Sequence, residues 1–185
     1  MGSMDSPKLQ AIIHQHQRGA IDLPAFRSAL RELSGRPQLS DSEIDHAWSS
    51  QIGDVDCRKL KLIEDLRRRG FKVYMLSTTD PLHAKVIEER FQRCLPDVSG
   101  DLYAHIFEKA YVTFELGLLK PDVRIYEEVL TDAGLKANQT LFLDDSLQNV
   151  LGAQKVGLYS VVIHDDSYVR WLPELLGVGS PWRVR

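Results

Sequence analysis

The sequence has few cysteines and no long apolar run. Cys57 and Cys94 are its only cysteines, too few for a disulfide framework or a structural zinc site. This cysteine content suits a reducing compartment, so the cytoplasm is the expected location. No apolar stretch approaches membrane-spanning length and the first residues lack the apolar core of a signal peptide, so neither a membrane nor export is expected.

An excess of one charge is also lacking. The chain has 23 Lys and Arg residues against 26 Asp and Glu residues, a net charge of −3. Nucleic acid and anionic membranes are therefore not expected partners. With 43% hydrophobic residues, the 185 residues can bury one sizeable core. The opening Met1-Gly2-Ser3 before Met4 has the form of a cloning remnant, so the natural chain is expected to begin at Met4.

The pattern of apolar residues changes along the chain. Residues 7–50 carry apolar side chains at three- and four-residue spacing, which predicts a small helical bundle. From Cys57 onward, helical segments alternate with expected strands at 71–78, 140–145 and 159–165. Such alternation predicts an α/β fold with a Rossmann-like, mostly parallel sheet. We therefore expect a helical segment at 1–56 and an α/β core at 57–185.

Polar side chains stand where two of these strands end, which is where parallel sheets bind ligands. The strand "KVYML" runs into Ser77, Thr78 and Thr79, whose hydroxyls and backbone N–H groups suit the oxygens of a phosphate. The strand "LFL" runs into Asp144 and Asp145, a pair of hard oxygen ligands of the kind that holds Mg²⁺. Taken singly, both features also fit ordinary helix caps and turns.

A lysine lies between these two strand ends. Lys120 precedes Pro121, which suits the first turn of a helix, so the ammonium is expected near that helix N-terminus. A lysine there can neutralise an anionic group as a point charge. Taken alone, Lys120 is equally well a surface lysine.

Together, in this order, these segments resemble the haloacid dehalogenase-like superfamily. "VYMLSTTDPLH", "ELGLLKPDVRIYEEVL" and "LFLDDSLQNVLGAQKVGL" are similar to its second, third and fourth motifs, and "HQHQRGAID" resembles its small helical cap. The resemblance is closest to small-cap phosphatases, such as bacterial glucose-1-phosphate phosphatases and the N-terminal phosphatase domain of soluble epoxide hydrolases. It implies a Mg²⁺-dependent phosphomonoester hydrolase that acts on a small phosphorylated metabolite.

The resemblance also implies roles for individual residues. Ser77, with Thr78 beside it, would bind the transferring phosphoryl group, and Lys120 would brace both the phosphate and the nucleophile. Asp144 and Asp145 would hold Mg²⁺, directly or through water. Asn149 would support the loop that carries them.

One motif of this superfamily has no counterpart at the expected place. Its reaction needs an aspartate nucleophile, and a second aspartate two residues later, at the tip of a central strand before the cap. Asp54 and Asp56 have this spacing, but "AWSSQIG" before them lacks the apolar run of a central strand, so a linker turn is the preferred interpretation. Asp5 is not at the end of an expected central strand either, because almost no apolar residue surrounds it in the sequence.

Two functions remain open on this basis. The first is a phosphatase whose first strand is absent through truncation or a misplaced start. The second is a non-catalytic relative, a pseudoenzyme, that binds a ligand or a protein partner. For the sequence as given we expect little or no phosphatase activity, because no carboxylate is placed to attack phosphorus.

The missing strand would also leave sheet edges unpaired. In this superfamily it lies between the strands that end here at Ser77 and Asp144. Either these two strands pair directly, or another chain or residues outside this sequence fill the gap, because buried unpaired backbone groups are costly. Association through the open edges, including a homo-oligomer, is therefore expected.

The histidines give weaker signals. His14 and His16 are two residues apart on an expected helix and so point to different sides, which indicates surface polarity and not a metal site. His83 follows the second motif, where a capping or surface role is preferred over one in the cleft.

Overall fold

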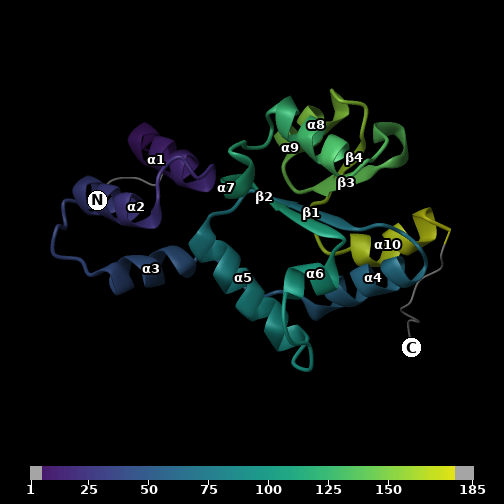
Figure 1. Cartoon of the computed structure of the whole chain (residues 1–185), viewed down its shortest axis with the longest axis horizontal. Coiled ribbons are helices and arrows are strands. Elements are labelled where there is room, and N and C mark those ends of the chain that lie inside the picture. Colours follow the sequence, from purple (N-terminus) through teal and green to yellow (C-terminus); the bar gives the residue numbers. More distant parts are fainter. Residues whose placement is uncertain (1–5, 178–185) are drawn as a thin grey trace. The chain divides into compact units, whose positions relative to one another are not determined.

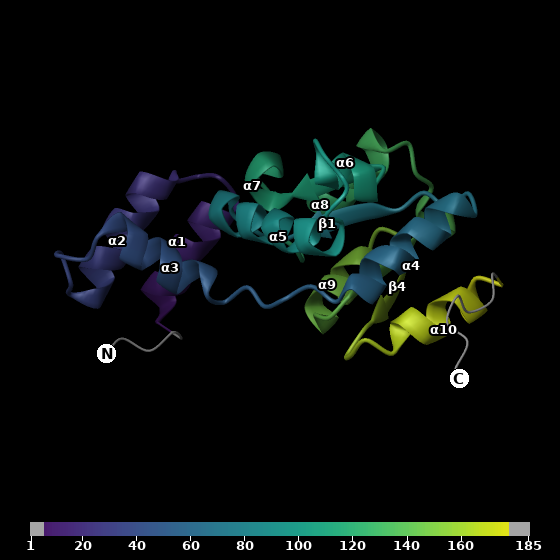
Figure 2. The same ribbon diagram turned by 90° about the horizontal axis from the view of Figure 1, so that it is seen from below.

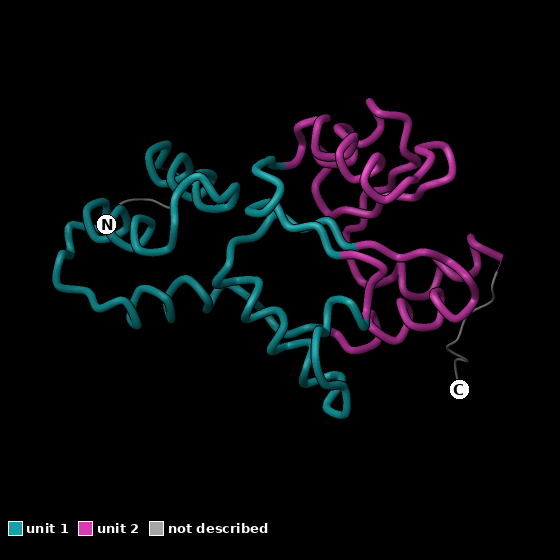
Figure 3. Tube along the Cα trace, viewed as in Figure 1, with its two compact units in different colours: residues 1–55, 75–105, 110–119 teal, residues 56–74, 106–109, 120–185 magenta. Residues whose placement is uncertain are grey.

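The chain folds into two compact units. The computed structural model describes residues 6–177. Unit 1 comprises residues 1–55, 75–105 and 110–119, and unit 2 comprises residues 56–74, 106–109 and 120–185 (Figure 3). The chain therefore crosses between the units several times along its length.

Unit 1 consists mainly of helices. Its elements, labelled in Figure 1, are α1 (Pro7–Gln17), α2 (Leu23–Ser34), α3 (Asp41–Ser49), α5 (Pro81–Cys94), α7 (Thr113–Leu116) and most of β1 (Tyr74–Ser77), α6 (Leu102–Ile106) and β2 (Lys109–Val112). The expected small bundle before residue 50 is thus present as α1, α2 and α3.

Local capping explains where the first helices begin and end. The Asp22 carboxylate accepts a hydrogen bond from Ala25 N at 2.8 Å and so satisfies a backbone N–H that α2 leaves unpaired. Gly35 ends α2 in the left-handed conformation (φ 65°), which glycine adopts without strain. Ser40 and Glu43 form a reciprocal capping box at the start of α3.

An aromatic core holds these helices together. Ile13 of α1, Phe26 of α2 and Trp48 of α3 are buried against one another, with Phe26 completely inaccessible. Burying one large apolar side chain contributes roughly 1.5–3 kcal/mol. Leu82 of α5 packs against the same cluster, so α5 shares this core.

Unit 2 contains the strand pair of β3 and β4. Its elements are α4 (Cys57–Arg68), α8 (Val123–Asp132), the short 3₁₀ helix η1 (Ala137–Gln139), β3 (Leu141–Asp144), α9 (Leu147–Gln154), β4 (Tyr159–Val162) and α10 (Tyr168–Leu175). β3 and β4 pair in parallel, with Leu141 opposite Tyr159 and Asp144 opposite Val162. α9 forms the crossover between them, as a parallel pair requires.

Apolar side chains from two helices cover this strand pair. Leu62 and Leu66 of α4 and Val169 and Leu172 of α10 form a buried cluster, against which the side chains of β3 also pack. α4 and α10 lie side by side in both views of the chain (Figure 1, Figure 2). Among the described helices, none has the length and apolar character needed to cross a bilayer.

The fold class agrees with the prediction, and the strands form two separate sheets. Among the described strands, β1 is bonded to β2 and β3 is bonded to β4.

Two smaller expectations differ from the structure. Pro121 lies outside the following helix, because α8 begins at Val123 with Asp122 as its N-cap. Neither Cys57 nor Cys94 is a free thiol, so the cysteines give no support for a reducing compartment. Trp182 and the other residues after 177 lie outside the described residues.

Candidate functional site

A buried ion pair lies at the carboxyl end of β3. Lys120 Nζ donates to Asp144 Oδ2 at 2.7 Å, and the two side chains are only 8% and 6% exposed. Burial raises the pKa of Asp144, but Lys120 and the N–H donors of Ser146 and Asn149 outweigh it and hold that pKa below its ordinary value. Asp144 is therefore a well-stabilised anion at neutral pH.

The second oxygen of Asp144 is also in use. Oδ1 accepts hydrogen bonds from Ser146 N and from Asn149 Nδ2, each at 2.9 Å. Ser146 is at the same time the N-cap of α9, so the first turn of this helix is tied to the carboxylate. The structure thus brings the Asn149 amide into contact with the Asp144 carboxylate.

Asp145, unlike the buried and hydrogen-bonded Asp144, is exposed to solvent. Its side chain is exposed, and it makes no hydrogen bond or ion pair with any other residue between 6 and 177. The described residues contain no group of three or more His, Cys, Asp or Glu side chains able to enclose a metal ion. Mg²⁺ does not need an enclosing group of protein ligands, because it commonly binds one or two carboxylates and keeps several of its waters. The Asp144 and Asp145 carboxylates therefore fit Mg²⁺ in their chemistry.

Two aromatic rings lie behind the ion pair. Lys120 Nζ lies 5.7 Å from the centroid of the Phe142 ring. The Phe142 and Tyr126 rings pack edge to face, with their centroids 5.4 Å apart and their planes at 77°. The Tyr126 hydroxyl donates to the backbone oxygen of Asn149 at 2.7 Å. Burial, with a smaller contribution from the Asp144 charge, raises the pKa of Tyr126, so its hydroxyl keeps its proton as the donor. Lys120, Phe142, Tyr126 and Asn149 thus form a continuous series of contacts that begins and ends at Asp144.

Close backbone packing fixes the same region. A Cβ atom on Gly152 of α9 would lie 2.6 Å from Pro121 O and 3.1 Å from Tyr126 Cε2. Only glycine therefore allows α9 to approach the segment that carries Lys120 this closely.

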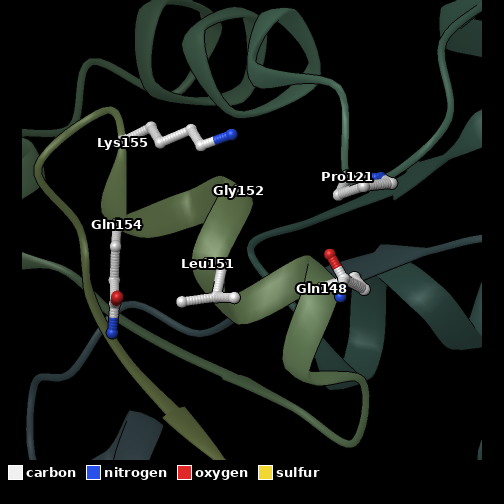
Figure 4. A pocket seen from close by; sticks show the side chains of 6 residues that line it. All are labelled: Pro121, Gln148, Leu151, Gly152, Gln154 and Lys155. Carbon is white, nitrogen blue, oxygen red and sulfur yellow. The ribbon is translucent and has the colours of Figure 1, made fainter.

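A pocket of about 420 Å³ is lined by Pro121 and by residues of α9 and its C-cap. Figure 4 shows Gln148, Leu151 and Gln154 projecting from α9, with Pro121 across from Gly152. None of the predicted site residues lines this pocket.

Ser77 and Thr78 belong to unit 1, at the end of β1. Ser77 is half-buried, Thr78 is exposed, and neither hydroxyl makes a hydrogen bond within residues 6–177. Thr79 differs: it is buried and its backbone is bonded to the Thr113 hydroxyl. The hydroxyls of Ser77 and Thr78 are thus free to bind a ligand, whereas Thr79 has a structural contact.

The Asp54 and Asp56 pair is not at a strand end. Asp54 is 83% exposed and forms ion pairs with Arg90 and Arg93 at 3.4 and 3.5 Å. Asp56 is the N-cap of α4, where it accepts from Arg58 N at 2.9 Å. The linker interpretation is therefore correct, because neither aspartate stands at the tip of a strand.

Sequence reasoning missed one buried polar cluster. His16 and His83 are not surface residues: they are 1% and 7% exposed, and both face the fully buried Asp80. No spacing rule signals this, because the three side chains come from two helices far apart in the sequence.

Comparison with known proteins identifies the family. The haloacid dehalogenase-like hydrolase family matches residues 52–157. The chain is 30% identical over 156 residues to a D-ribitol-5-phosphate phosphatase of Bacteroides thetaiotaomicron, covering 83% of this chain and 72% of that protein. It is 29% identical over 153 residues to the sesquiterpene phosphatase astK of Aspergillus oryzae, covering 82% and 71%.

Solved structures of the same family are also similar to this chain. A haloacid dehalogenase family enzyme of Bacteroides thetaiotaomicron, crystallised as its magnesium complex, superposes with a TM-score of 0.78 at 33% identity, covering 87% of this chain and 79% of that one. An aspartate-to-alanine variant of the same enzyme, bound to magnesium and inorganic phosphate, gives a TM-score of 0.76 at 33% identity over 85% and 80% of the two chains. The chain therefore belongs to the haloacid dehalogenase-like hydrolase family.

Proposed function

We propose that this chain binds the phosphoryl group of a small phosphorylated metabolite together with Mg²⁺, as a relative of the phosphomonoester phosphatases. Lys120 neutralises the phosphoryl group, and the Ser77 and Thr78 hydroxyls donate to its oxygens. Asp144 and Asp145 hold the metal ion, and Asn149 keeps Asp144 in place. The cytoplasm remains the proposed location, and residues 1–56 the proposed cap.

The buried Lys120–Asp144 ion pair is the observation that carries this proposal. Two charges placed in a desolvated position cost stability unless their geometry is good, so a gain in stability does not by itself account for this pair. Here the exposed, unpaired Asp145 carboxylate stands next to it. The relatives support the same assignment, since one acts on ribitol 5-phosphate and a structural neighbour binds magnesium and phosphate.

Bound Mg²⁺ supplies positive charge beside the phosphoryl oxygens. The chain's own contributions are separate from that charge. Lys120, held by Asp144 and lying near the Phe142 ring, offers an ammonium whose direction is fixed. Fixed positive groups of this kind stabilise phosphoryl charge because they need no reorganisation on binding.

We further propose that phosphate-ester hydrolysis by this chain is strongly impaired. A phosphoaspartate route needs a carboxylate that attacks phosphorus, and the only Asp-x-Asp pair of the sequence, Asp54 and Asp56, lies in the linker and the cap of α4. Positioning and charge without a nucleophile leave little of the rate.

Hydrolysis of an aryl phosphate with and without Mg²⁺ tests this proposal. We expect little turnover from the purified chain, and no change in it on substitution of Lys120→Ala or Asp144→Asn. The exposed Lys136→Ala is the matched control. Mg²⁺-dependent turnover that disappears in both site variants but survives in Lys136→Ala would show that a nucleophile exists, and Asp56→Asn would be tested next.

A second function, binding of a partner strand, is favoured by the outer edge of β3. The carbonyls of Thr140 and Asp144 accept from Tyr159 N and Ile163 N, so the even-numbered residues of β3 bond toward β4. The backbone groups of Leu141 and Leu143 consequently point the other way.

Within the described residues these outward groups of β3 are not hydrogen-bonded, although both side chains are half-buried. Unpaired backbone groups along the edge of a strand favour addition of an extended strand. We propose a second copy of the chain as the partner. Light scattering across a dilution series tests it: association at high concentration is expected, and a stable monomer throughout would contradict it.

A further inference from the structure

Asp80 is a fully buried carboxylate at the N-cap of α5, immediately after the loop that carries Ser77 and Thr78. Its Oδ1 accepts from the backbone N–H groups of Leu82 and His83, each at 3.0 Å. Its Oδ2 accepts from the Trp48 indole N–H at 2.9 Å. Three N–H donors on one side chain suit a charged carboxylate better than a protonated acid.

The two ring nitrogens of His83 both face acceptors. Nε2 lies 2.9 Å from the backbone oxygen of Trp48, which can only accept, so Nε2 carries a proton. Nδ1 lies 3.1 Å from Asp80 Oδ2, and the ring is stacked on the Trp48 indole at 4.8 Å. An unprotonated Nδ1 would point its lone pair at a carboxylate oxygen in a buried site, which is repulsive. The geometry therefore requires a proton on Nδ1 as well.

His16 is a second imidazole beside the same carboxylate. Its Nδ1 donates to the backbone oxygen of Ile21 at 3.3 Å, and its ring stacks on Phe26 at 4.2 Å. Its Nε2 is buried without a hydrogen-bond partner among the described residues and lies 3.7 Å from Asp80 Oδ1. The ionisable groups that face Asp80 are thus His16 from α1 and His83 from α5, while α2 and α3 contribute aromatic rings.

The loop before Asp80 is fixed at two successive residues. Thr79 N donates to Thr113 Oγ1 at 3.1 Å, and that hydroxyl donates back to Thr79 O at 3.0 Å. Both threonines are buried. With Thr79 and Asp80 held, the backbone of Ser77 and Thr78 has few conformations left, which lowers the entropy lost when a ligand binds.

We propose that His83 carries protons on both ring nitrogens and that its ion pair with Asp80 positions the Ser77 and Thr78 loop to bind a tetrahedral oxyanion. This inference rests on the proposed phosphate-binding role of that loop. Asp80 and His83 are positioning residues, which act through the backbone of Thr79. Without the proton on Nδ1 the attraction between His83 and Asp80 is lost, and the loop before Asp80 is held by fewer contacts.

Nitrogen-15 NMR of the histidine side chains in the full chain reads this protonation directly. At neutral pH both His83 nitrogens are expected to carry protons. In Asp80→Asn the Nδ1 proton of His83 loses its ion-pair partner, and the backbone amide signals of Ser77 and Thr78 are expected to shift together with the His83 nitrogen signals. A singly protonated His83 in the unsubstituted chain, or loop amides that do not change in Asp80→Asn, would overturn the proposal.

Binding of sulfate at one fixed pH supplies the second readout, because sulfate is a tetrahedral oxyanion. Asp80→Asn should weaken sulfate binding several-fold, and His14→Gln, a substitution of an exposed histidine of α1, should leave it unchanged. Equal sulfate affinity of Asp80→Asn and the unsubstituted chain would contradict the proposal.

Failure of the proposed phosphate-binding function gives a different result from failure of the positioning contact. Absence of sulfate binding, with loop amides that still change together with the His83 signals in Asp80→Asn, would overturn oxyanion binding at Ser77 and Thr78 and leave only the positioning contact. Should Asp80→Asn fail to fold, the protonation of the two His83 nitrogens in the spectrum of the unsubstituted chain decides the matter by itself.

Discussion

Lys120 Nζ lies 2.7 Å from Asp144 Oδ2 in a position that water scarcely reaches. The lysine precedes α8 and the aspartate ends β3, so the pair joins two segments that are 24 residues apart. Since Asn149 and Ser146 occupy the other oxygen of Asp144, this carboxylate has a fixed orientation. The exposed Asp145 beside it is left as the freer metal ligand.

Removal of one partner from this ion pair should strongly destabilise the fold. Lys120→Met keeps most of the side-chain volume but leaves the Asp144 charge buried and unpaired, which costs about 3–5 kcal/mol. Urea denaturation of both proteins measures the difference in the free energy of unfolding. The double variant Lys120→Met, Asp144→Asn is the matched control and should recover part of the loss. Equal stability of Lys120→Met and the unsubstituted chain would contradict the buried geometry.

Acid should remove the stabilisation that Asp144 provides. Its pKa is lowered from 3.8, mainly because Lys120 and the N–H donors outweigh the opposing effect of burial. A carboxyl group whose pKa is lower in the folded state contributes stability above its unfolded pKa, and that contribution is lost as pH falls through the folded pKa. The stability difference between the unsubstituted chain and Asp144→Asn should therefore shrink as pH falls below 3.8. A difference that stays constant with pH would contradict the assignment.

Tyr126→Phe should weaken Mg²⁺ binding without removing a metal ligand. The substitution deletes the hydrogen bond to Asn149 O, at a cost of about 0.5–1.5 kcal/mol, and loosens the first turn of α9. Tyr103→Phe is the matched control, since its hydroxyl donates to Ala84 O at 3.0 Å in unit 1. Calorimetry with Mg²⁺ should show weaker binding in Tyr126→Phe alone. Equal effects of both substitutions would indicate a general loss of stability.

Gly152→Ala should disturb the same helix. The added methyl group would lie 2.6 Å from Pro121 O, so α9 or the segment before α8 must shift, at a cost of about 1–3 kcal/mol. Gly53→Ala provides the control, because nothing lies within 4 Å of its added methyl group. Thermal unfolding should show a clearly lower midpoint for Gly152→Ala than for Gly53→Ala. Two equal midpoints would mean that this close approach does not exist.

Much of the fold could be predicted from the sequence because its signals are local. The apolar run before Asp144 predicted β3 and the helical pattern that follows it predicted α9, and both are present. Asn149 was expected by resemblance to support the loop of Asp144, and its amide donates to that carboxylate. Lys120 was expected to brace the phosphate and the nucleophile, and in the structure it donates to Asp144. The same local signals placed Asp56 in a linker turn, where it caps α4.

Other features could not be predicted, because they depend on contacts between distant segments. The short helices α6 and α7, of 5 and 4 residues, are too brief for a periodic pattern. His16 and His83 gave no signal of burial, since their partner Asp80 becomes apparent only when α1, α3 and α5 pack together. Pro121 fitted a first helical turn, yet Asp122 caps the helix after it.

Calorimetric titration with inorganic phosphate, with and without Mg²⁺, tests the central claim most directly. We expect phosphate to bind the chain more tightly when Mg²⁺ is present, because the metal ion and Lys120 share its charge. Lys120→Met should weaken this binding about tenfold or more, the loss of one charged hydrogen bond, whereas Lys136→Ala should leave it unchanged. Absence of phosphate binding in the presence of Mg²⁺, or equal binding by Lys120→Met, would contradict the assignment of Lys120 and Asp144 as a phosphate and magnesium site.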